Sequence, residues 1–147
     1  MPYEFKMTHR VEFAETDMAG IIHFSSFFRY MEVTEHAFFR SLGLSIAGQN
    51  ATHHVGWPRV KVSAEFRYPL QFEDEVEVHL LVKAKGSKSL TYEFRFRKIN
   101  CEPAIDVGQG SLIIVCVAKD ESGKMKATNI PEDIARVIDV APADLLE

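Results

Sequence analysis

The feature that most constrains the fold of this chain is a run of aromatic residues at helical spacing. Bulky apolar side chains recur at intervals of three and four residues, at Phe24, Phe27, Phe28, Met31, Phe38 and Leu42. This period predicts a helix over about 25–42, with Ser25 or Ser26 capping its first turn and Gly43 ending it. A helix this aromatic must be largely enclosed by the rest of the chain.

Outside this helix the residues mostly alternate with a period of two, which is typical of strands with one buried face. The alternating segments are 5–13, 57–68, 76–84, 90–96 and 105–118. Short connections between consecutive strands favour antiparallel pairing in one curved sheet, and the apolar 105–118 segment is expected in its middle. A short helix is expected over 131–138. The prediction is an α+β fold, one domain over 1–147, with the long helix against the concave face of the sheet.

Composition and residue spacing exclude several classes of function. A net charge of −4 gives no general attraction for nucleic acid, and no apolar run approaches the ~18 residues of a membrane span. The first residues contain no apolar core of a secretion signal. Cys101 and Cys116 lack the spacing of a disulfide framework, so the expected location is cytoplasmic. His53 and His54 are adjacent without a suitably spaced carboxylate or cysteine, so no metal site is expected.

A short motif, Glu15-Thr16-Asp17-Met18-Ala19-Gly20, lies between the first strand and the helix. Its lone carboxylate, Asp17, stands a few residues ahead of a helix N-terminus, where free N–H groups can hold a negative charge. A base or nucleophile beside such amides is what acyl transfer requires. The alternative is that Asp17 only forms an Asx-turn with the backbone that follows it.

The chain also resembles a known family over most of its length. The matching stretches are Val11-Glu12-Phe13, Thr16-Asp17, Ala19-Gly20-Ile21-Ile22, Leu42-Gly43-Leu44, Gly56-Trp57-Pro58, Phe66, Phe72-Glu73-Asp74-Glu75-Val76 and Lys88-Ser89. With the aromatic helix, they are similar to the hotdog-fold acyl-CoA thioesterases of the 4-hydroxybenzoyl-CoA thioesterase type. The resemblance implies a curved antiparallel sheet around one long central helix. It also implies hydrolysis of an acyl-CoA to the free acid and coenzyme A, without a cofactor.

The resemblance implies catalytic roles for two residues. Asp17 would be the catalytic carboxylate, acting as general base or nucleophile, and the backbone N–H of Phe24 would donate to the oxyanion. Family members form dimers by joining two sheets edge to edge, and these often pair into tetramers. The active sites of such assemblies lie at the subunit interface.

Seven further residues are expected to bind substrate: His23, Glu32, Trp57, Arg59, Lys85, Lys88 and Ser89. The resemblance implies that residues 57–59 face the neighbour's Asp17 and that coenzyme A phosphates meet the turn over 85–89. The alternative for the lysines of this turn, and for Arg95 and Arg97 nearby, is a solvated basic face. Glu35 interrupts the apolar stripe of the helix, as part of a site wall or in a buried hydrogen bond.

Two other functions remain open from the sequence. The basic turn could serve an acidic acyl carrier protein as readily as a nucleotide, which would make the chain an acyl-carrier-protein thioesterase. A non-catalytic acyl-CoA-binding module would explain the aromatic core without needing Asp17. The glycines of the Val107-Gly108-Gln109-Gly110-Ser111 segment precede no helix, so a bulge or a close strand approach is expected there instead of a phosphate loop.

Overall fold

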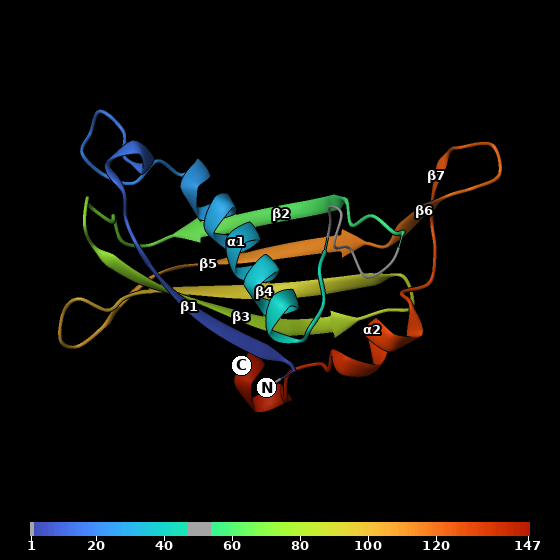
Figure 1. The fold of residues 1–147 in the computed structure, drawn as a ribbon. Helices are drawn as coiled ribbons and strands as arrows, with labels where there is room; N and C mark the ends of the chain where they lie inside the picture. Colours follow the sequence, from blue (N-terminus) through green and yellow to red (C-terminus); the bar gives the residue numbers. More distant parts are fainter. Residues whose placement is uncertain (1, 47–53) are drawn as a thin grey trace.

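The computed structural model describes residues 2–46 and 54–147 and contains one long helix and a curved sheet (Figure 1). The elements in chain order are β1 (Glu4–Arg10), the 3-10 helix η1 (Phe13–Glu15), α1 (Ser25–Ser41), β2 (Arg59–Phe66), β3 (Glu75–Lys85), β4 (Ser89–Lys98), β5 (Ile105–Val115), β6 (Val117–Lys119), β7 (Met125–Ala127), α2 (Glu132–Val137) and α3 (Ala143–Leu146). Within the described ranges, no helix is long and apolar enough to cross a membrane.

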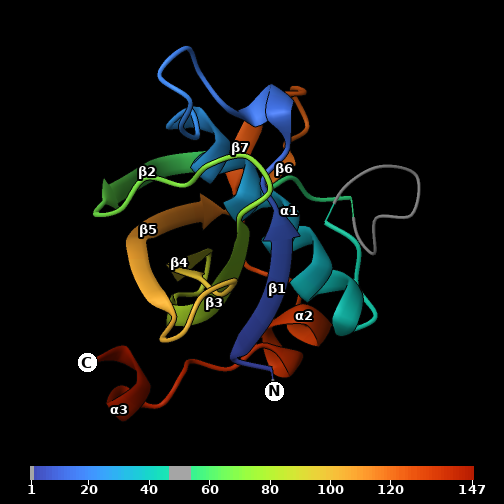
Figure 2. The same ribbon diagram turned by 90° about the vertical axis from the view of Figure 1, so that its left-hand side faces the viewer.

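Five strands form the main sheet, in the order β1-β3-β4-β5-β2, and every pairing is antiparallel. The sheet curls around α1, as Figure 2 shows. This confirms the predicted α+β hotdog architecture. β5 is an inner strand, as its apolar sequence indicated, but it lies next to the edge strand β2, and the middle strand is β4. The chain order did not reveal the place of β2, which skips β3 and pairs with β5, so β1 and β2 are the two edges of the sheet.

The core lies between the concave face of the sheet and α1. Alternate side chains of β3 and β4 face it and are at most 1% exposed: Val76, Val78, Leu80, Val82, Leu90, Tyr92, Phe94 and Phe96. They meet Phe27, Phe38 and Phe39 of the helix, as the aromatic spacing predicted. Fully burying one such side chain contributes about 1.5–3 kcal/mol, so this one layer dominates the stability of the fold.

The two ends of α1 are held differently. At the C-terminal end, Gly43 has a φ of 78°, which only glycine adopts without strain, and its N–H donates to Arg40 O at 3.0 Å. The Leu44 N–H donates to Phe39 O at 2.9 Å, which completes the predicted stop. At the N-terminal end, the predicted serine cap is wrong. Phe24 is the N-cap residue and no side-chain cap hydrogen bond forms there.

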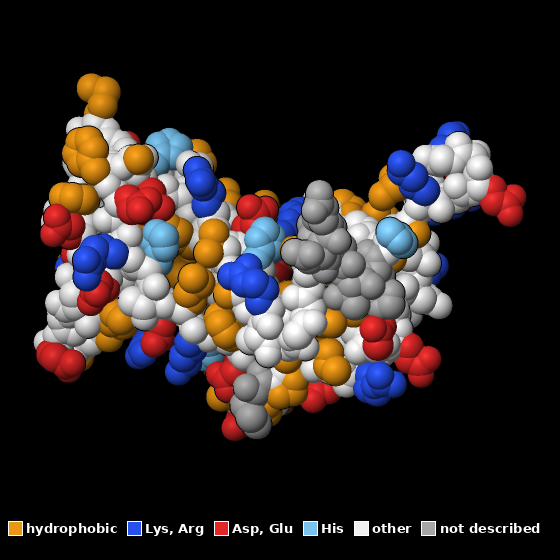
Figure 3. Space-filling view, in the orientation of Figure 1, with side chains coloured by type: hydrophobic (Ala, Val, Ile, Leu, Met, Phe, Trp, Pro, Cys, Tyr) orange, Lys and Arg blue, Asp and Glu red, His pale blue; other side chains and the backbone are white. Residues whose placement is uncertain are grey.

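Two strand ends differ from the periodic pattern. β1 ends at Arg10, and Phe13 lies in η1 with its side chain 76% exposed, so it is not part of the buried face. β5 ends at Val115, because the Cys116 N–H turns to Lys88 O at 2.7 Å. The chain then forms the separate hairpin of β6 and β7, which projects from the body of the molecule (Figure 3).

The glycine-containing segment of β5 is a close strand approach, as predicted. The pairing of β4 with β5 skips Val107, and the N–H groups of Arg67 and Tyr68 both donate to the Val107 carbonyl, at 2.8 and 3.3 Å. A Cβ on Gly108 would collide with the carbonyl of Glu65 in β2. Glycine therefore lets β2 approach β5 closely at the end of their pairing, where Phe66 lies opposite Gly108.

Candidate active site

The loop over 16–22 holds Asp17 in a fixed position beside the start of α1. Thr16 and Ile22 form an isolated bridge, and within it the Asp17 N–H donates to Ile21 O at 2.8 Å. Gly20, with a φ of 81°, closes the turn by donating to Asp17 O at 3.0 Å. The Thr16 hydroxyl donates to Phe13 O at 2.7 Å, which is a turn contact. These bonds order the loop without using the Asp17 carboxylate.

The Asp17 carboxylate has one oxygen engaged. Oδ1 accepts the Ala19 N–H at 2.9 Å, which is the Asx-turn that the sequence left as an alternative. In the described part of the chain, Oδ2 has no hydrogen-bond partner. The side chain is exposed and lines an apolar cavity of about 390 Å³. The turn therefore orients the carboxylate and leaves an oxygen for chemistry.

The amides at the start of α1 differ in whether they have an acceptor. The His23 N–H donates to Glu15 O at 2.8 Å, and the Ser25 N–H donates to His23 Nδ1 at 3.2 Å. The Ser26 N–H donates to His23 O at 2.9 Å. Among the residues that the structure describes, the Phe24 N–H has no acceptor. It lies at the positive end of the helix dipole, where an anion is stabilised.

Asp17 and Phe24 line the same cavity. Its other walls are almost entirely apolar and come from the loop, from α1 and from the end of β2: Ile21, Ile22, Phe27, Phe66, Arg67, Tyr68 and Pro69. The Arg67 guanidinium is paired outside, with Asp106 at 3.1 Å and Glu65 at 2.9 Å. Sequence reasoning did not assign Phe66 and Tyr68 to the site, because only the fold brings the end of β2 against the start of α1.

Some of these apolar walls are still open to solvent in the single chain. Phe24 is 58% exposed, Phe66 49% and Tyr68 36%. Phe13 and Phe72 are also exposed and stack edge to face at 5.8 Å, near the same end of the molecule. In Figure 3, hydrophobic side chains gather over the end where Figure 1 shows η1 and the start of α1. An exposed apolar surface around a polar group is typical of a binding site.

His23 lies beside the start of α1 but does not contact Asp17. Its Nδ1 is 2.8 Å from Ser25 Oγ and its ring stacks on that of Phe24. It lines a second, more polar hollow together with Glu15 and Arg29. The substrate-binding role of His23 stays a prediction.

The middle of α1 contains Glu32 and is flanked by Trp57 and Arg59. Among the described residues, these three are not part of the apolar cavity that Asp17 lines. Trp57 is buried, with its ring 5.9 Å from that of Phe39. The Arg59 guanidinium binds Glu35 at 2.5 Å and lies 3.8 Å from the Glu32 carboxylate. Glu35 is fully buried, and this burial raises its pKa although Arg59 acts in the opposite direction. Of the two alternatives for Glu35, the structure shows the buried hydrogen bond.

The β3–β4 turn contains Lys85, Lys88 and Ser89. Of these, Lys85 forms hydrogen bonds with another part of the chain. Its ammonium donates to the carbonyls of Ala135 and Ile138, both at 2.8 Å, and so holds the end of α2. Lys88 is exposed and Ser89 half-buried. The binding roles of these three residues stay predictions.

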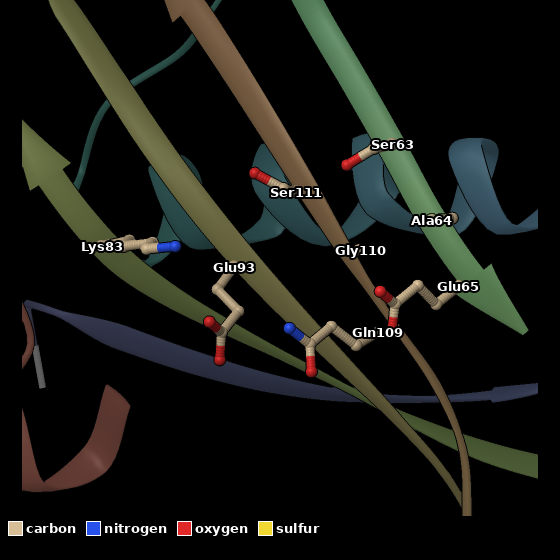
Figure 4. Close-up of a pocket in the computed structure, with 8 residues that line it drawn as sticks. All are labelled: Ser63, Ala64, Glu65, Lys83, Glu93, Gln109, Gly110 and Ser111. Atoms are coloured by element: carbon tan, nitrogen blue, oxygen red, sulfur yellow. The ribbon is translucent and has the colours of Figure 1, made fainter. Parts of the chain in front are cut away.

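The neighbouring cations lie on the outer face of the sheet. Arg95 binds Glu93 at 2.7 Å and Arg97 binds Glu77 at 2.9 Å. Lys83 borders a small polar hollow of about 80 Å³ on the side of the sheet away from α1 (Figure 4). This hollow lacks helix amides, and the arginine pairs favour the solvated-face reading for this strand surface.

Within residues 2–46 and 54–147, no group of three or more histidine, cysteine, aspartate or glutamate side chains could hold a metal ion. His53 lies outside the described residues.

Comparisons with known proteins show the family and the fold of this chain. A profile of the thioesterase-like superfamily matches residues 11–138. An inferred esterase of Aquifex aeolicus (strain VF5) is 33% identical over 96 residues, which are 64% of this chain and 71% of that protein. The crystal structure of 4-hydroxybenzoyl-CoA thioesterase from Pseudomonas sp. strain CBS-3 superposes with a TM-score of 0.81 at 21% identity, covering 92% of this chain and 99% of that one. A 1,4-dihydroxy-2-naphthoyl-CoA thioesterase from Synechocystis gives 0.81 at 21%, with coverages of 92% and 95%. These structural matches show the hotdog fold.

Proposed function

Because the chain belongs to the thioesterase-like superfamily, we propose that it hydrolyses an acyl-CoA thioester to the free acid and coenzyme A. One observation supports this proposal above all others. Asp17 and Phe24 line one apolar cavity, and in the described part of the chain the Phe24 N–H has no hydrogen-bond acceptor.

The two groups supply the two things that thioester hydrolysis needs. The Phe24 N–H donates to the carbonyl oxygen and stabilises the negative charge that develops there, an effect typically worth about 2.7–4 kcal/mol. Asp17 takes a proton from a water molecule that attacks the carbonyl carbon, or attacks that carbon itself to form a mixed anhydride that water then cleaves. In both routes the C–S bond breaks and coenzyme A leaves as a thiolate. A thiolate is a good leaving group, so no strong general acid is needed.

The acyl group occupies the apolar cavity. Phe27 and Phe66 form its aromatic walls, with ring centroids 4.9 Å apart, and Tyr68 and Ile21 extend the surface toward the opening. A carbonyl placed between Asp17 and the Phe24 amide then has its acyl chain in contact with these side chains. Burying that chain contributes about 25 cal/mol per Å² of apolar surface.

We infer further that the site is completed by a second copy of the chain. β2 is an edge strand whose side chains Val60 and Val62 are 57% and 44% exposed, and an exposed apolar edge is a template for strand pairing. Antiparallel pairing of two β2 strands places the Trp57–Arg59 end of one near the Phe66 end of the other. Arg59 and Glu32 then approach the neighbour's Asp17, and the exposed Lys88 remains for the coenzyme A phosphates.

The test is Asp17→Asn, which keeps the size of the side chain and an oxygen that accepts the Ala19 N–H. Release of free thiol from a panel of acyl-CoA substrates is expected to fall by at least ~100-fold in kcat, as for loss of a general base. Asp120→Asn is the matched control, because Asp120 also accepts a backbone N–H two residues later, from Ser122 at 2.9 Å, but lies in the β6–β7 turn.

Unchanged hydrolysis by Asp17→Asn would contradict the catalytic assignment. Tight acyl-CoA binding without turnover by the unmodified protein, across the whole panel, would favour the binding-module alternative. Faster release of the same acyl group from acyl carrier protein than from coenzyme A would make the carrier the substrate.

A further inference from the structure

Glu15 connects three parts of the chain that meet behind the active site. One carboxylate oxygen, Oε1, accepts the Tyr30 hydroxyl of α1 at 2.7 Å and the Glu12 N–H at 2.8 Å. The other, Oε2, lies 3.3 Å from His9 Nε2 of β1. The side chain is only 17% exposed, so these contacts are largely shielded from water.

The backbone of the same residue holds the start of α1. The Glu15 carbonyl accepts the His23 N–H at 2.8 Å and the Ser26 hydroxyl at 3.2 Å. His23 and Ser26 flank Phe24, whose N–H is the proposed oxyanion donor. Asp17 follows Glu15 by two residues in the chain. Glu15 is therefore hydrogen-bonded to the residues on either side of Phe24 and is linked to Asp17 by the backbone of Thr16.

Tyr30 makes this connection rigid. It is 2% exposed, and its ring packs 4.4 Å from that of His9 and 6.3 Å from that of Phe27. Burial, followed by the hydrogen bond to Glu15, raises the pKa of Tyr30, so its hydroxyl stays a proton donor to the carboxylate. A buried donor on a rigid helix fixes the position of the group that accepts from it.

We propose that Glu15 is a positioning residue for thioester hydrolysis, which sets the Asp17 carboxylate against the Phe24 N–H through its bonds to Tyr30, Glu12 and the start of α1. The proposal rests on the proposed function. Glu15 does not line the apolar cavity in which we propose that the acyl group binds. Its effect is on geometry, and a displacement of about 1 Å between reacting groups can cost ~100-fold in rate.

The experiment measures kcat and KM for a good acyl-CoA substrate in the full chain. Glu15→Ala and Tyr30→Phe remove opposite ends of the same hydrogen bond, and each is expected to lower kcat by about 10- to 100-fold with KM changed less than threefold. Glu15→Gln keeps an oxygen that accepts from Tyr30, and it is expected to recover most of the activity.

The matched control is Glu4→Ala. Glu4 and His79 form another shielded carboxylate–histidine pair, at 2.7 Å, which also joins β1 to a neighbouring part of the chain. Glu4 is the first residue of β1 and lies at the opposite end of this strand from His9. Thermal unfolding of all variants shows the loss of stability that each causes. If Glu15→Ala and Glu4→Ala lose the same amount of stability but Glu15→Ala loses more kcat, the result supports a positioning role for Glu15.

A double substitution with Asp17→Asn separates this role from a general loss of structure. If Glu15 acts through Asp17, adding Glu15→Ala to Asp17→Asn lowers the residual rate by less than twofold. A full multiplicative loss in the double variant, or unchanged kcat in Glu15→Ala alone, overturns the positioning role while the proposed function stands. Full activity of Asp17→Asn overturns both.

Discussion

The Asp17 side chain has a structural role in addition to the chemical role that we propose for it. Its Oδ1 accepts the Ala19 N–H, and this bond restricts the carboxylate to one orientation. Restricting a catalytic group before the substrate arrives lowers the entropy that must be lost in the transition state. The Asx-turn and catalysis, which were alternatives from the sequence, are therefore compatible at this residue.

Glu35 is the residue whose ionisation is coupled to stability. Its carboxylate is fully buried between α1 and the sheet with Arg59, beside the buried Tyr92 hydroxyl. Burial raises the pKa of Glu35 in the folded chain above the ordinary value of 4.5. Above pH 4.5 the unfolded chain therefore releases this proton before the folded chain does. Unfolding becomes easier as the pH rises through that range.

Glu35→Gln is expected to reveal this coupling, because it keeps the shape of the side chain and removes its charge. The free energy of unfolding of Glu35→Gln, relative to the unmodified protein, is expected to rise as the pH increases from about 4.5 toward the raised pKa. Urea unfolding at a series of pH values measures the difference. A difference that stays constant over this range, or falls, would contradict the assignment.

At the scale of elements, the close approach of β2 to β5 shapes the cavity. Gly108 brings the two strands together at Glu65, and the next residue of β2, Phe66, is a cavity wall. The chain then passes through Tyr68 and Pro69, which also line it. The form of the acyl pocket thus depends on a position that has no side chain of its own.

Gly108→Ala is expected to destabilise the fold by about 1–3 kcal/mol, because the added methyl group meets a backbone carbonyl that cannot rotate away. Moving that end of β2 also shifts Phe66, so KM is expected to rise more than kcat falls. Denaturant unfolding and steady-state kinetics measure the two effects. Gly123→Ala is the control, because a methyl group added at this turn glycine meets no other atom. Its φ of 85° means that this control measures the backbone strain of replacing a glycine without a collision. Wild-type stability of Gly108→Ala would show that the strands can separate freely.

The elements themselves were largely predictable, because their periodicities reflect local burial. α1 and its end at Gly43 follow directly from aromatic spacing and one glycine. The place of β2 and the pairing of Arg59 with Glu35 depend on contacts between distant segments, which no local pattern encodes. The Phe24 N–H was assigned through resemblance alone, since a backbone group leaves no mark in the sequence. The β6–β7 hairpin was missed because the apolar run continues through Cys116, where the chain changes sheets.

For the whole molecule, the two edges of the sheet differ in chemistry. The exposed side chains of β1 are all polar or charged, Lys6, Thr8 and Arg10, whereas those of β2 include the apolar Val60 and Val62 beside charged residues such as Lys61 and Glu65. Charged edge residues discourage strand addition and apolar ones permit it. The sheet is therefore expected to extend at β2 only.

The double substitution V60D/V62D is expected to prevent this association by placing like charges along the shared edge. Light scattering on the unmodified protein should give at least a dimer, and on the double variant a monomer with thioesterase activity reduced by ~10-fold or more, because each site loses the neighbour's residues. Val140→Asp is the control, since Val140 is equally exposed, at 44%, but lies in the C-terminal segment. A fully active monomer would contradict the shared site.

The oxyanion donor that we propose at position 24 belongs to the main chain, and this has a consequence for how the enzyme can diversify. Every amino acid except proline supplies the same N–H there, so the side chain at this position is free to vary without loss of the donor. The Phe24 ring, more than half exposed at the mouth of the cavity, can thus be exchanged to admit other acyl groups. In the proposed mechanism, the side chain of Phe24 affects the substrate range and its main-chain N–H affects the rate of hydrolysis.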